Sequence, residues 1–247
     1  MKRRNLLTAS LVLLLLWQAL AMLVHQPILP TPLKVLVTFW SELTRGALLG
    51  HFLASLWRVV ASTLLAVVTA APAGLLLGQS KRLDGLFAPL VYILYPIPKV
   101  VFLPVVLLFL GIGNLSKIFV IFLILFFQVL VLVRDQAAGL RPELLRSVRS
   151  LGAGRMALFR FVYLPASLPG ILTALRQSVG TAVAVLYVAE LFATQKGLGY
   201  YIYLNGSTLF NYPAMYAGVI AMSLLGLGLY FSVDGLERWL CPWQKNR

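Results

Sequence analysis

Six long apolar stretches constrain the fold of this chain more than any other feature of its sequence. Lipid offers the backbone no hydrogen-bond partner, so a segment that crosses a bilayer core of about 30 Å does so as a helix of about 20 apolar residues. Only 11% of the residues are charged, against about 25% in a soluble domain. We therefore predict an all-α, polytopic membrane protein with six transmembrane helices, at approximately 6–24, 52–78, 86–110, 115–133, 168–192 and 214–233.

The surplus of basic residues predicts the orientation of these helices. The chain has 21 Lys and Arg against 7 Asp and Glu, a net charge of +14. Lys and Arg in short loops are retained on the cytoplasmic side of a membrane. Most basic residues fall in one set of the alternating loops and in the terminal segments. We expect both termini in the cytoplasm, and we assign the positive charge to orientation rather than to nucleic-acid binding.

Few residues could support catalysis or metal binding. Cys241 is the only cysteine in the sequence, which excludes an internal disulfide and a multi-cysteine metal site. His25 and His51 are the only histidines and leave little for a zinc site or a catalytic triad. We predict no catalytic, cofactor-binding or metal-binding residue, and we do not expect the chain to be an enzyme.

Residues 1–27 are predicted to contain the first transmembrane helix. A basic start and Ala19-Leu20-Ala21, which resembles a cleavage site, make a signal peptide the alternative. We favour a retained helix, because the apolar run exceeds the roughly 7–15 residues of a signal peptide core. Residues 28–51 are predicted to be an extracytoplasmic amphipathic segment. Its helix begins after Thr31, and its apolar face comprises Leu33, Leu36, Val37, Trp40 and Leu43.

The rest of the sequence is predicted to be a transmembrane domain over 52–240 and a cytoplasmic tail over 241–247. Its most informative part is the polar loop 134–165, which is longer than a connection between neighbouring helices needs. Pro142 suits a first helical turn and Gly152 the residue just past a helix end, which predicts a short helix at 142–151 and a second at about 155–161. This basic, amphipathic pair either docks on a cytoplasmic partner or lies on lipid headgroups.

At these residues the sequence resembles the transmembrane subunits of type I ABC importers. Their cytoplasmic loop carries Glu-Ala-Ala, three residues, Gly, nine residues, an aliphatic residue, any residue, and Leu-Pro. Here Arg146-Ser147-Val148 occupies the Glu-Ala-Ala positions, Gly152 the glycine, and 162–165 (Val-Tyr-Leu-Pro) the end, with the spacing kept. Arg146 replaces the acid, so an acidic contact at that position is not carried over.

Other segments resemble the nitrate/sulfonate/taurine-type branch of these permeases. They occur in the order of that branch and together cover residues from about 28 to 200. The segments are 28–32 (Ile-Leu-Pro-Thr-Pro), 55–59 (Ser-Leu-Trp-Arg-Val), 95–99 (Tyr-Pro-Ile-Pro-Lys), 151–153, 164–169, Leu175-Arg176, Ala189-Glu190 and 197–199.

The resemblance implies the type I ABC importer permease fold in a bacterial inner membrane, with a cytoplasmic coupling-helix loop. It implies as partners two copies of a cytoplasmic ATP-binding subunit, an extracytoplasmic solute-binding protein and a second permease chain, with no nucleic acid. The second permease chain is either another copy of this chain, which gives the homodimer that we favour, or a close relative. The sequence contains no phosphate-binding loop, so ATP would be hydrolysed by another subunit and this chain would bind no cofactor. Residues predicted to couple to the ATPase are Glu143, Arg146, Ser147, Val148, Leu151, Gly152, Ala153, Leu164 and Pro165.

Three ionisable residues at bilayer depth are candidates for the translocation pathway or a gate, because charges are costly there and usually face protein or water. Arg176 and Glu190 lie in the fifth span, too far apart to pair with each other. Lys99 lies in the third span with Tyr95, Pro96 and Pro98, where the prolines predict a kink or break. For each candidate the alternative is a structural role in helix packing or in ion pairing.

The function most consistent with these features is import of a small solute by alternating access, driven by ATP hydrolysis in a separate subunit. The alternative is a secondary transporter driven by an ion gradient. Such a transporter would need a coupling-ion site, for which only Glu190 is a candidate acid within a span. The sequence does not specify the solute.

Overall fold

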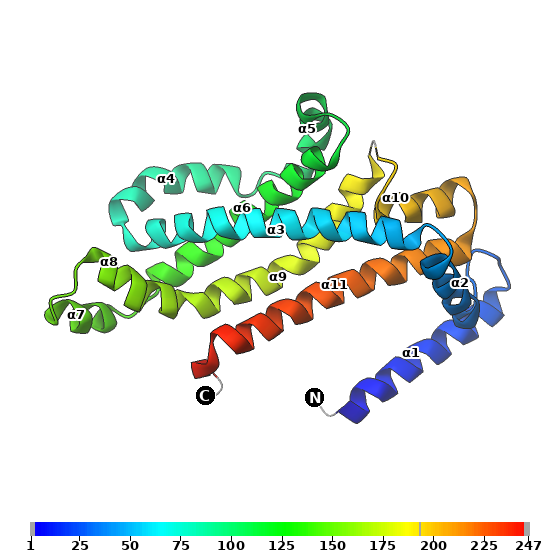
Figure 1. The fold of residues 1–247 in the computed structure, drawn as a ribbon, viewed down its shortest axis with the longest axis horizontal. Coiled ribbons are helices and arrows are strands. Elements are labelled where there is room, and N and C mark those ends of the chain that lie inside the picture. The colour runs from blue at the N-terminus through cyan, green and yellow to red at the C-terminus, as the bar shows by residue number, and fades with distance from the viewer. Residues whose placement is uncertain (1–2, 193, 245–247) are drawn as a thin grey trace. The chain divides into compact units, whose positions relative to one another are not determined.

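The computed structural model describes residues 3–192 and 194–244, and within these ranges all regular structure is helical (Figure 1). The long helices are α1 (Arg3–Val24), α3 (Leu48–Gln79), α6 (Asn114–Ala138), α9 (Leu164–Leu191) and α11 (Tyr212–Leu240). Shorter elements connect them: α2 (Pro32–Thr44), α4 (Lys81–Leu94), η1 (Lys99–Phe102), α5 (Leu103–Leu110), α7 (Pro142–Ser150), α8 (Arg155–Leu158), η2 (Phe159–Tyr163), α10 (Leu198–Tyr203), η3 (Leu204–Thr208) and η4 (Pro242–Gln244).

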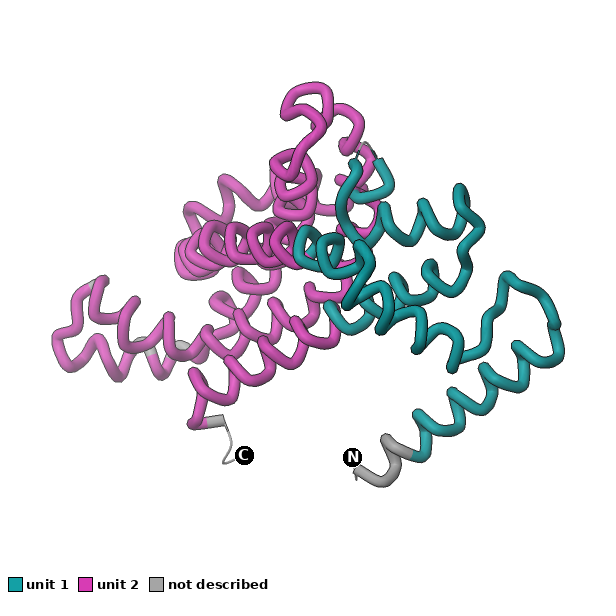
Figure 2. Tube along the Cα trace, turned by 45° about the vertical axis from the view of Figure 1, so that its right-hand side comes forward, with its two compact units in different colours: residues 1–55, 190–225 teal, residues 56–189, 226–247 magenta. Residues whose placement is uncertain are grey.

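The chain forms two compact units, which Figure 2 shows in different colours. Unit 1 comprises Met1–Ser55 and Glu190–Leu225, and unit 2 comprises Leu56–Ala189 and Gly226–Arg247. The two units are defined by how densely their residues pack together, whereas the segments predicted from the sequence are defined by their location relative to the membrane. The predicted boundaries at residues 27, 51 and 240 therefore remain a prediction.

Four helices in the described part of the chain are long and apolar enough to cross a membrane: Leu48–Gln79, Asn114–Ala138, Met156–Leu191 and Tyr212–Leu240. A bent pair, Lys81–Leu94 and Lys99–Leu110, qualifies as a fifth span when its two parts are taken together. The apolar part of α1 described by the structure, Thr8–Val24, is shorter. The polytopic all-α fold is confirmed, while the count of six spans remains a prediction.

The third predicted span is broken, as its prolines indicate. The two parts of the pair meet at 75°. Pro96 and Pro98 lie in the gap between α4 and η1, where neither can supply the backbone N–H that a continuing helix needs. A hydrogen-bonded ion pair between Asp84 of α4 and Arg134 of α6 holds the first arm of the bent pair.

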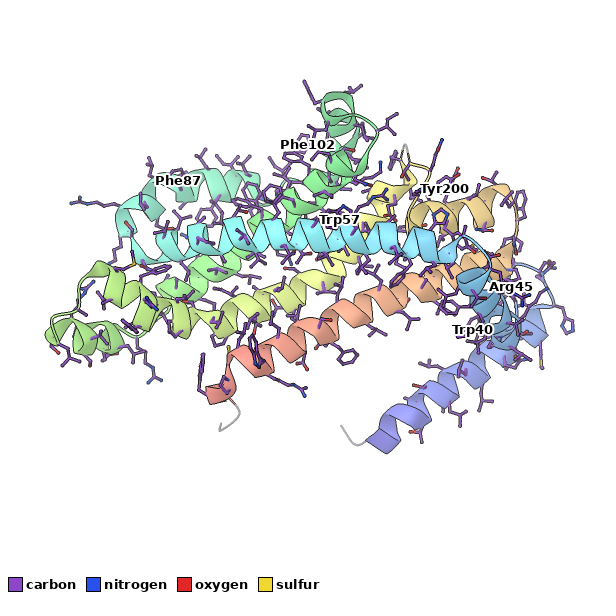
Figure 3. The ribbon with its side chains drawn as sticks, in the orientation of Figure 1. Trp40, Arg45, Trp57, Phe87, Phe102 and Tyr200 are labelled. Carbon is purple, nitrogen blue, oxygen red and sulfur yellow. The ribbon has the colours of Figure 1, made fainter. Side chains whose placement is uncertain are left out.

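Helices α3 and α6 share the core of unit 2. Ala70 and Leu75 of α3 pack in one buried cluster with Val129, Leu130 and Val133 of α6. Unit 2 also exposes large apolar side chains, among them Trp57 of α3, Phe87 of α4 and Phe102 of η1 (Figure 3). A surface with large exposed apolar side chains suits contact with lipid.

The predicted amphipathic helix is confirmed as α2, with Pro32 in its first turn. Thr31 occupies the N-cap position, although its side chain makes no capping hydrogen bond. Pro32 and Val35 are the buried residues of the helix, while Leu33, Leu36, Val37 and Trp40 of the predicted apolar face stay exposed (Figure 3). An apolar face left open by the chain itself agrees with an interfacial helix, which stays a prediction.

The loop 134–165 contains the first predicted helix as α7, which ends one residue earlier than expected. The second predicted helix differs from expectation. It does not end near residue 161, because α8 continues through the π-helical turn η2 directly into α9. A π-turn changes the backbone hydrogen-bond pattern just before Pro165, which lets the helix pass a residue that lacks an N–H. The helix that contains the fifth predicted span therefore begins with α8 at Arg155 rather than near residue 168.

Candidate functional site

The helix pair α7–α8, which we call the elbow, carries most of the residues predicted to couple to an ATPase. Val148 and Ala153 pack against a buried cluster of Leu158, Val162 and Tyr163. This cluster fixes α7 to the start of the long helix run formed by α8, η2 and α9. The elbow is therefore attached to the rest of unit 2 through packed side chains and a continuous helix.

The opposite side of the elbow is open. Glu143, Arg146 and Ser147 are exposed, and Leu151 is 84% exposed. Leu164 begins α9 and is partly exposed, with Pro165 beside it. The predicted residues thus fall into an inner group that supports the elbow and an outer group that is accessible to another protein.

The turn between α7 and α8 requires a glycine because of its backbone conformation. Gly152 has a φ of +81°, a region that residues with a Cβ rarely adopt. A Cβ at this position would meet no atom within 4 Å. Conformation, and not lack of space, therefore explains this glycine of the motif.

The broken span places a buried lysine against the free end of a helix. The Nζ of Lys99 donates hydrogen bonds to the carbonyl oxygens of Leu94 at 2.7 Å, Tyr95 at 2.9 Å and Ile97 at 3.2 Å. It also lies 4.5 Å from the centre of the Phe127 ring. The last carbonyls of a helix lack intrahelical partners and carry partial negative charge. Lys99 satisfies these carbonyls where the prolines interrupt the helix.

A cavity of about 400 Å³ lies beside this break. Residues 95–100 form one wall, so Tyr95, Pro96, Pro98 and Lys99 all line the cavity. The helices α6 and α9 contribute polar side chains to it, Gln128 and Thr181 respectively. The structure thus brings four of the predicted pathway residues together around one space.

Glu190 lies in a buried hydrogen-bond cluster of unit 1. Its side chain is fully buried, with 0% exposure. The Ser55 hydroxyl lies 2.8 Å from both carboxylate oxygens, and the Gly199 N–H donates to Oε2 at 2.9 Å. Ser55 Oγ in turn accepts the Leu198 N–H at 2.7 Å. We call this arrangement the Glu190 cluster, and it ties the start of α3 to the end of α9 and the start of α10.

Two further residues complete the Glu190 cluster. His51 Nδ1 lies 3.0 Å from both the backbone N and the backbone O of Gly197. Gly197 has a φ of +130°, and a Cβ at this position would overlap the Glu190 carboxylate. Because the carboxylate is enclosed on all sides, a direct contact between it and a binding protein does not fit this structure.

Arg176 is held in an interhelical ion-pair network of unit 2. Its Nη1 lies 3.1 Å from Asp234 Oδ1 and 3.1 Å from Glu237 Oε2, both on α11. Asp234 also pairs with Arg238 at 2.7 Å. The structural alternative considered for Arg176, pairing between helices, is what the structure shows.

Several partners of these residues were missed by sequence reasoning. Ser55 was noted only within the segment 55–59, and His51 only as one of two histidines. Asp234 and Glu237 were not considered, although two acids three residues apart at the end of an apolar helix are a usable signal. Arg58, whose Nε donates to Asn114 Oδ1 at 2.8 Å, was noted without its partner.

Comparison with known proteins identifies the family that this arrangement belongs to. The family model described as the binding-protein-dependent transport system inner membrane component matches residues 62–246. The chain belongs to this permease family.

Curated relatives of the permease cover nearly its whole length. The taurine transport system permease protein TauC of Escherichia coli is 31% identical over 239 residues, covering 94% of this chain and 86% of the relative. The putative aliphatic sulfonates transport permease protein SsuC of Bacillus subtilis is 31% identical over 237 residues, covering 95% and 86%. The resemblance to the taurine/sulfonate branch of ABC importer permeases is thereby confirmed.

A solved structure agrees with the fold of the permease. A chain of the MetNI methionine ABC transporter, in an inward-facing conformation, matches with a TM-score of 0.72 at 22% identity. The match covers 81% of this chain and 99% of the other. Fold and family together make the chain a multi-pass inner-membrane component of a transport system.

Proposed function

We propose that this permease moves a small solute inward by alternating access, driven by ATP hydrolysis in a separate cytoplasmic subunit. The observation that carries the proposal is the elbow. Its outer residues Glu143, Arg146, Ser147 and Leu151 are open, while Val148 and Ala153 anchor it. Because α8 runs without interruption through η2 into α9, a push on the elbow would be transmitted to a membrane-crossing helix.

The proposed partners rest on the family to which the chain belongs. Two cytoplasmic ATP-binding subunits would bind the elbows of two permease chains, for which we propose a homodimer, and an extracytoplasmic binding protein would deliver the solute. The basic residues around the elbow support a cytoplasmic location for the elbow and for both termini by the positive-inside rule. The chain itself would bind no nucleotide. Its coupling residues would transmit movement and would take no part in a chemical reaction.

We propose that the cavity at the broken span belongs to the translocation pathway. Non-helical backbone at membrane depth is tolerated only where it is buried in protein or lines a watery space. Lys99 would hold the break open toward Gln128 and Thr181, and Tyr95, Pro96 and Pro98 would shape it. Arg176 and Glu190 would act away from the cavity, as an interhelical tie and as a gate at the end of α9.

The solute class to test first is the small sulfonates. The relatives named for taurine and for aliphatic sulfonates support this choice. Binding of candidate solutes by the cognate binding protein can be measured from ligand-dependent melting.

Uptake into vesicles tests the mechanism. The permease is reconstituted with its ATPase subunit and binding protein, and uptake of radiolabelled solute is followed with ATP inside. We expect uptake to require both partners and to stop with a non-hydrolysable ATP analogue. Uptake by the permease alone under a proton or sodium gradient would instead establish the secondary transporter.

Crosslinking tests the role of the elbow independently of transport. A cysteine introduced at Arg146 or Leu151, both exposed, is expected to crosslink to the ATPase subunit in intact membranes. A cysteine at Lys34, exposed on α2, is the matched control and should not crosslink. Capture of the ATPase from Lys34→Cys and not from Arg146→Cys would contradict the assignment.

A further inference from the structure

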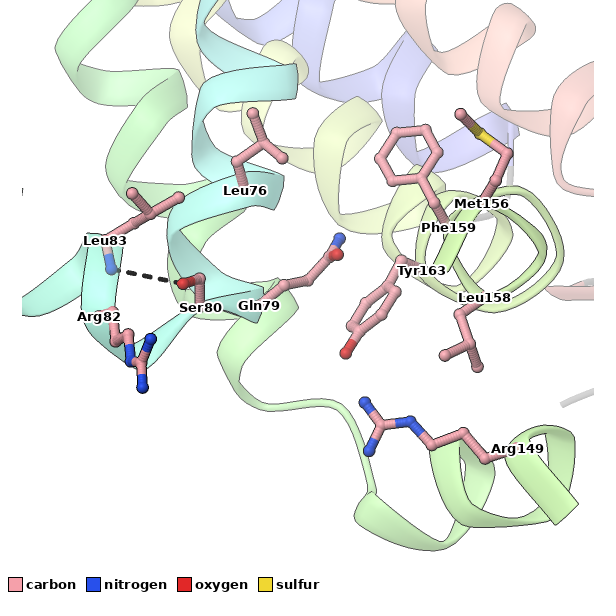
Figure 4. Close-up of a pocket in the computed structure, with 10 residues that line it drawn as sticks. All are labelled: Leu76, Gln79, Ser80, Arg82, Leu83, Arg149, Met156, Leu158, Phe159 and Tyr163. Carbon is pink, nitrogen blue, oxygen red and sulfur yellow. Dashed lines mark hydrogen bonds between the residues drawn. The ribbon is translucent and has the colours of Figure 1, made fainter. Parts of the chain in front are cut away.

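A second cavity, of about 720 Å³, lies where α3 ends and the elbow begins (Figure 4). Gln79 lies at the end of α3 and Arg82 at the start of α4. The opposite wall comes from the elbow, with Arg149, and from the turn η2 that follows it, with Tyr163. This cavity is separate from the cavity at the broken span, and no step of the proposed transport mechanism uses it.

The polar lining of this cavity includes one buried donor that lacks a partner and two exposed arginines. Gln79 Nε2 is buried and has no hydrogen-bond partner within the described ranges. Neither Arg82 nor Arg149 has an ion-pair partner among the described residues. Figure 4 shows the Gln79 amide, the Tyr163 hydroxyl and the Arg149 guanidinium facing the same space. A buried donor without a partner is costly, so an acceptor from outside the chain would be stabilised at Gln79 Nε2. The two arginines are exposed and can reach the same acceptor from solvent.

The charges of the residues that line the cavity indicate which kind of hydrogen-bond acceptor would bind there. None of the ten described residues that line the cavity is acidic, and two are arginines. An oxyanion with several oxygens can accept hydrogen bonds from two guanidinium groups and an amide at once. The polar lining therefore favours a phosphate or sulfonate group over a neutral or cationic ligand.

The rest of the lining is apolar and open. Leu76 and Leu83 are exposed at the mouth, and Met156 is 78% exposed. Leu76 lies on a helix that is long and apolar enough to cross a membrane, near its basic end. An oxyanion site that continues onto exposed apolar side chains at such an end has the chemistry of an anionic lipid, with a charged head and an acyl chain.

We propose that this cavity binds the phosphate headgroup of an anionic phospholipid from the cytoplasmic leaflet. The headgroup lies between Arg82 and Arg149, with Gln79 Nε2 as a further donor, and an acyl chain runs along Leu76. Because one arginine is on α4 and the other on the elbow, the bound lipid connects the two elements and stabilises the elbow.

The test uses the full permease in complex with its ATPase subunit in nanodiscs, with phosphatidylglycerol titrated into phosphatidylcholine. Retained phosphatidylglycerol is counted by native mass spectrometry, and the melting temperature is recorded in parallel. Wild type should retain phosphatidylglycerol and melt at a higher temperature as its fraction rises. In Arg82→Gln/Arg149→Gln, half-maximal retention should require roughly 25-fold more phosphatidylglycerol, since each of the two basic residues near an anionic surface contributes on the order of fivefold in affinity.

A matched double variant separates the cavity from general surface charge. Arg141→Gln/Arg160→Gln removes the same charge from exposed positions outside the cavity and should bind phosphatidylglycerol like wild type. Gln79→Leu should weaken retention without a loss of charge. Melting in pure phosphatidylcholine reports whether each variant folds.

The outcomes decide the proposal. Equal losses of phosphatidylglycerol retention in the two double variants would overturn it. An absence of any phosphatidylglycerol effect in the complex would also overturn it, because it would mean that the ATPase subunit covers the cavity. A parallel titration with free phosphate and with taurine in pure phosphatidylcholine distinguishes the source of the oxyanion. Protection by either small anion alone, lost in Arg82→Gln/Arg149→Gln, would overturn the lipid assignment in favour of a soluble ligand.

Discussion

Glu190 is a carboxylate enclosed by donors, and its surroundings predict what a change would do. In Glu190→Gln an amide donor replaces one acceptor oxygen and faces either the Gly199 N–H or the Ser55 hydroxyl. Leaving a buried donor unsatisfied lowers the free energy of unfolding by about 1–3 kcal/mol. We therefore expect reduced stability in denaturant titrations and reduced uptake. Glu143→Gln, at an exposed position, is the control for stability and should change it little.

A substitution at Gly197 tests the Glu190 cluster by changing the backbone next to the carboxylate. Gly197→Ala combines a disfavoured φ with overlap of the Glu190 carboxylate, so it should destabilise the chain at least as much as Glu190→Gln. Gly50→Ala, where a Cβ would meet nothing within 4 Å, should be neutral or slightly stabilising. Equal stability of the two alanine variants would mean that the Glu190 cluster is not formed.

The single native cysteine should be unreactive. Cys241 is buried, and burial together with the Glu237 carboxylate raises the pKa of its thiol above the usual range. A raised pKa keeps the thiol protonated at pH 8, and the thiolate is the reactive form. Maleimide labelling of the native protein should be slow and become fast on denaturation. Labelling of Cys241 as fast as that of an introduced Arg146→Cys would contradict this burial.

At the residue scale the sequence could mark the unusual positions but not their partners. Arg176, Glu190 and Lys99 stood out because a charge at bilayer depth is costly. Which residue offsets that cost depends on packing between helices distant in sequence. Ser55 lies 135 positions from Glu190, and no local pattern connects the two.

Lys99 links the residue scale to that of a whole element, since it stabilises the break in the third span. Lys99→Met would remove the Lys99 hydrogen bonds to three carbonyl oxygens, of which Leu94 O still accepts the Ile97 N–H. The change should lower the free energy of unfolding by about 2 kcal/mol. Lys99→Arg keeps hydrogen-bond donors at the position and should lower the free energy of unfolding by less than Lys99→Met. Lys34→Met removes an exposed lysine and serves as the control. Stability can be followed by unfolding in a denaturing detergent, and equal effects at positions 99 and 34 would refute the capping role.

Among the elements, those with local signals were predictable. Prolines at first turns marked α2 and α7, and paired prolines marked the break after α4. The run from α8 into α9 was not predictable, because Leu164-Pro165 normally indicates a helix boundary and the π-turn that bypasses it has no sequence signature.

At the scale of the whole molecule, coupling requires that the elbow keep its shape while it moves α9. Gly152 holds the turn of the elbow at a φ of +81°, so Gly152→Ala should strain or reshape the turn at a cost of about 1–2 kcal/mol. Because nothing lies within 4 Å of the added methyl group, folding of the membrane helices should survive the change. ATP-driven uptake should fall several-fold, along with crosslinking from Arg146→Cys to the ATPase subunit.

Gly154→Ala provides the matched control for this prediction. Gly154 lies two residues further along the same turn, also has free space around its Cβ position, and does not have a positive φ. Gly154→Ala should therefore keep uptake, crosslinking to the ATPase subunit and melting temperature close to those of the wild type. If Gly152→Ala transports like Gly154→Ala, force does not pass through the shape of this turn. If Gly152→Ala instead fails to fold, the turn is needed for assembly of the permease and not for coupling alone, and the melting temperature in nanodiscs distinguishes the two results.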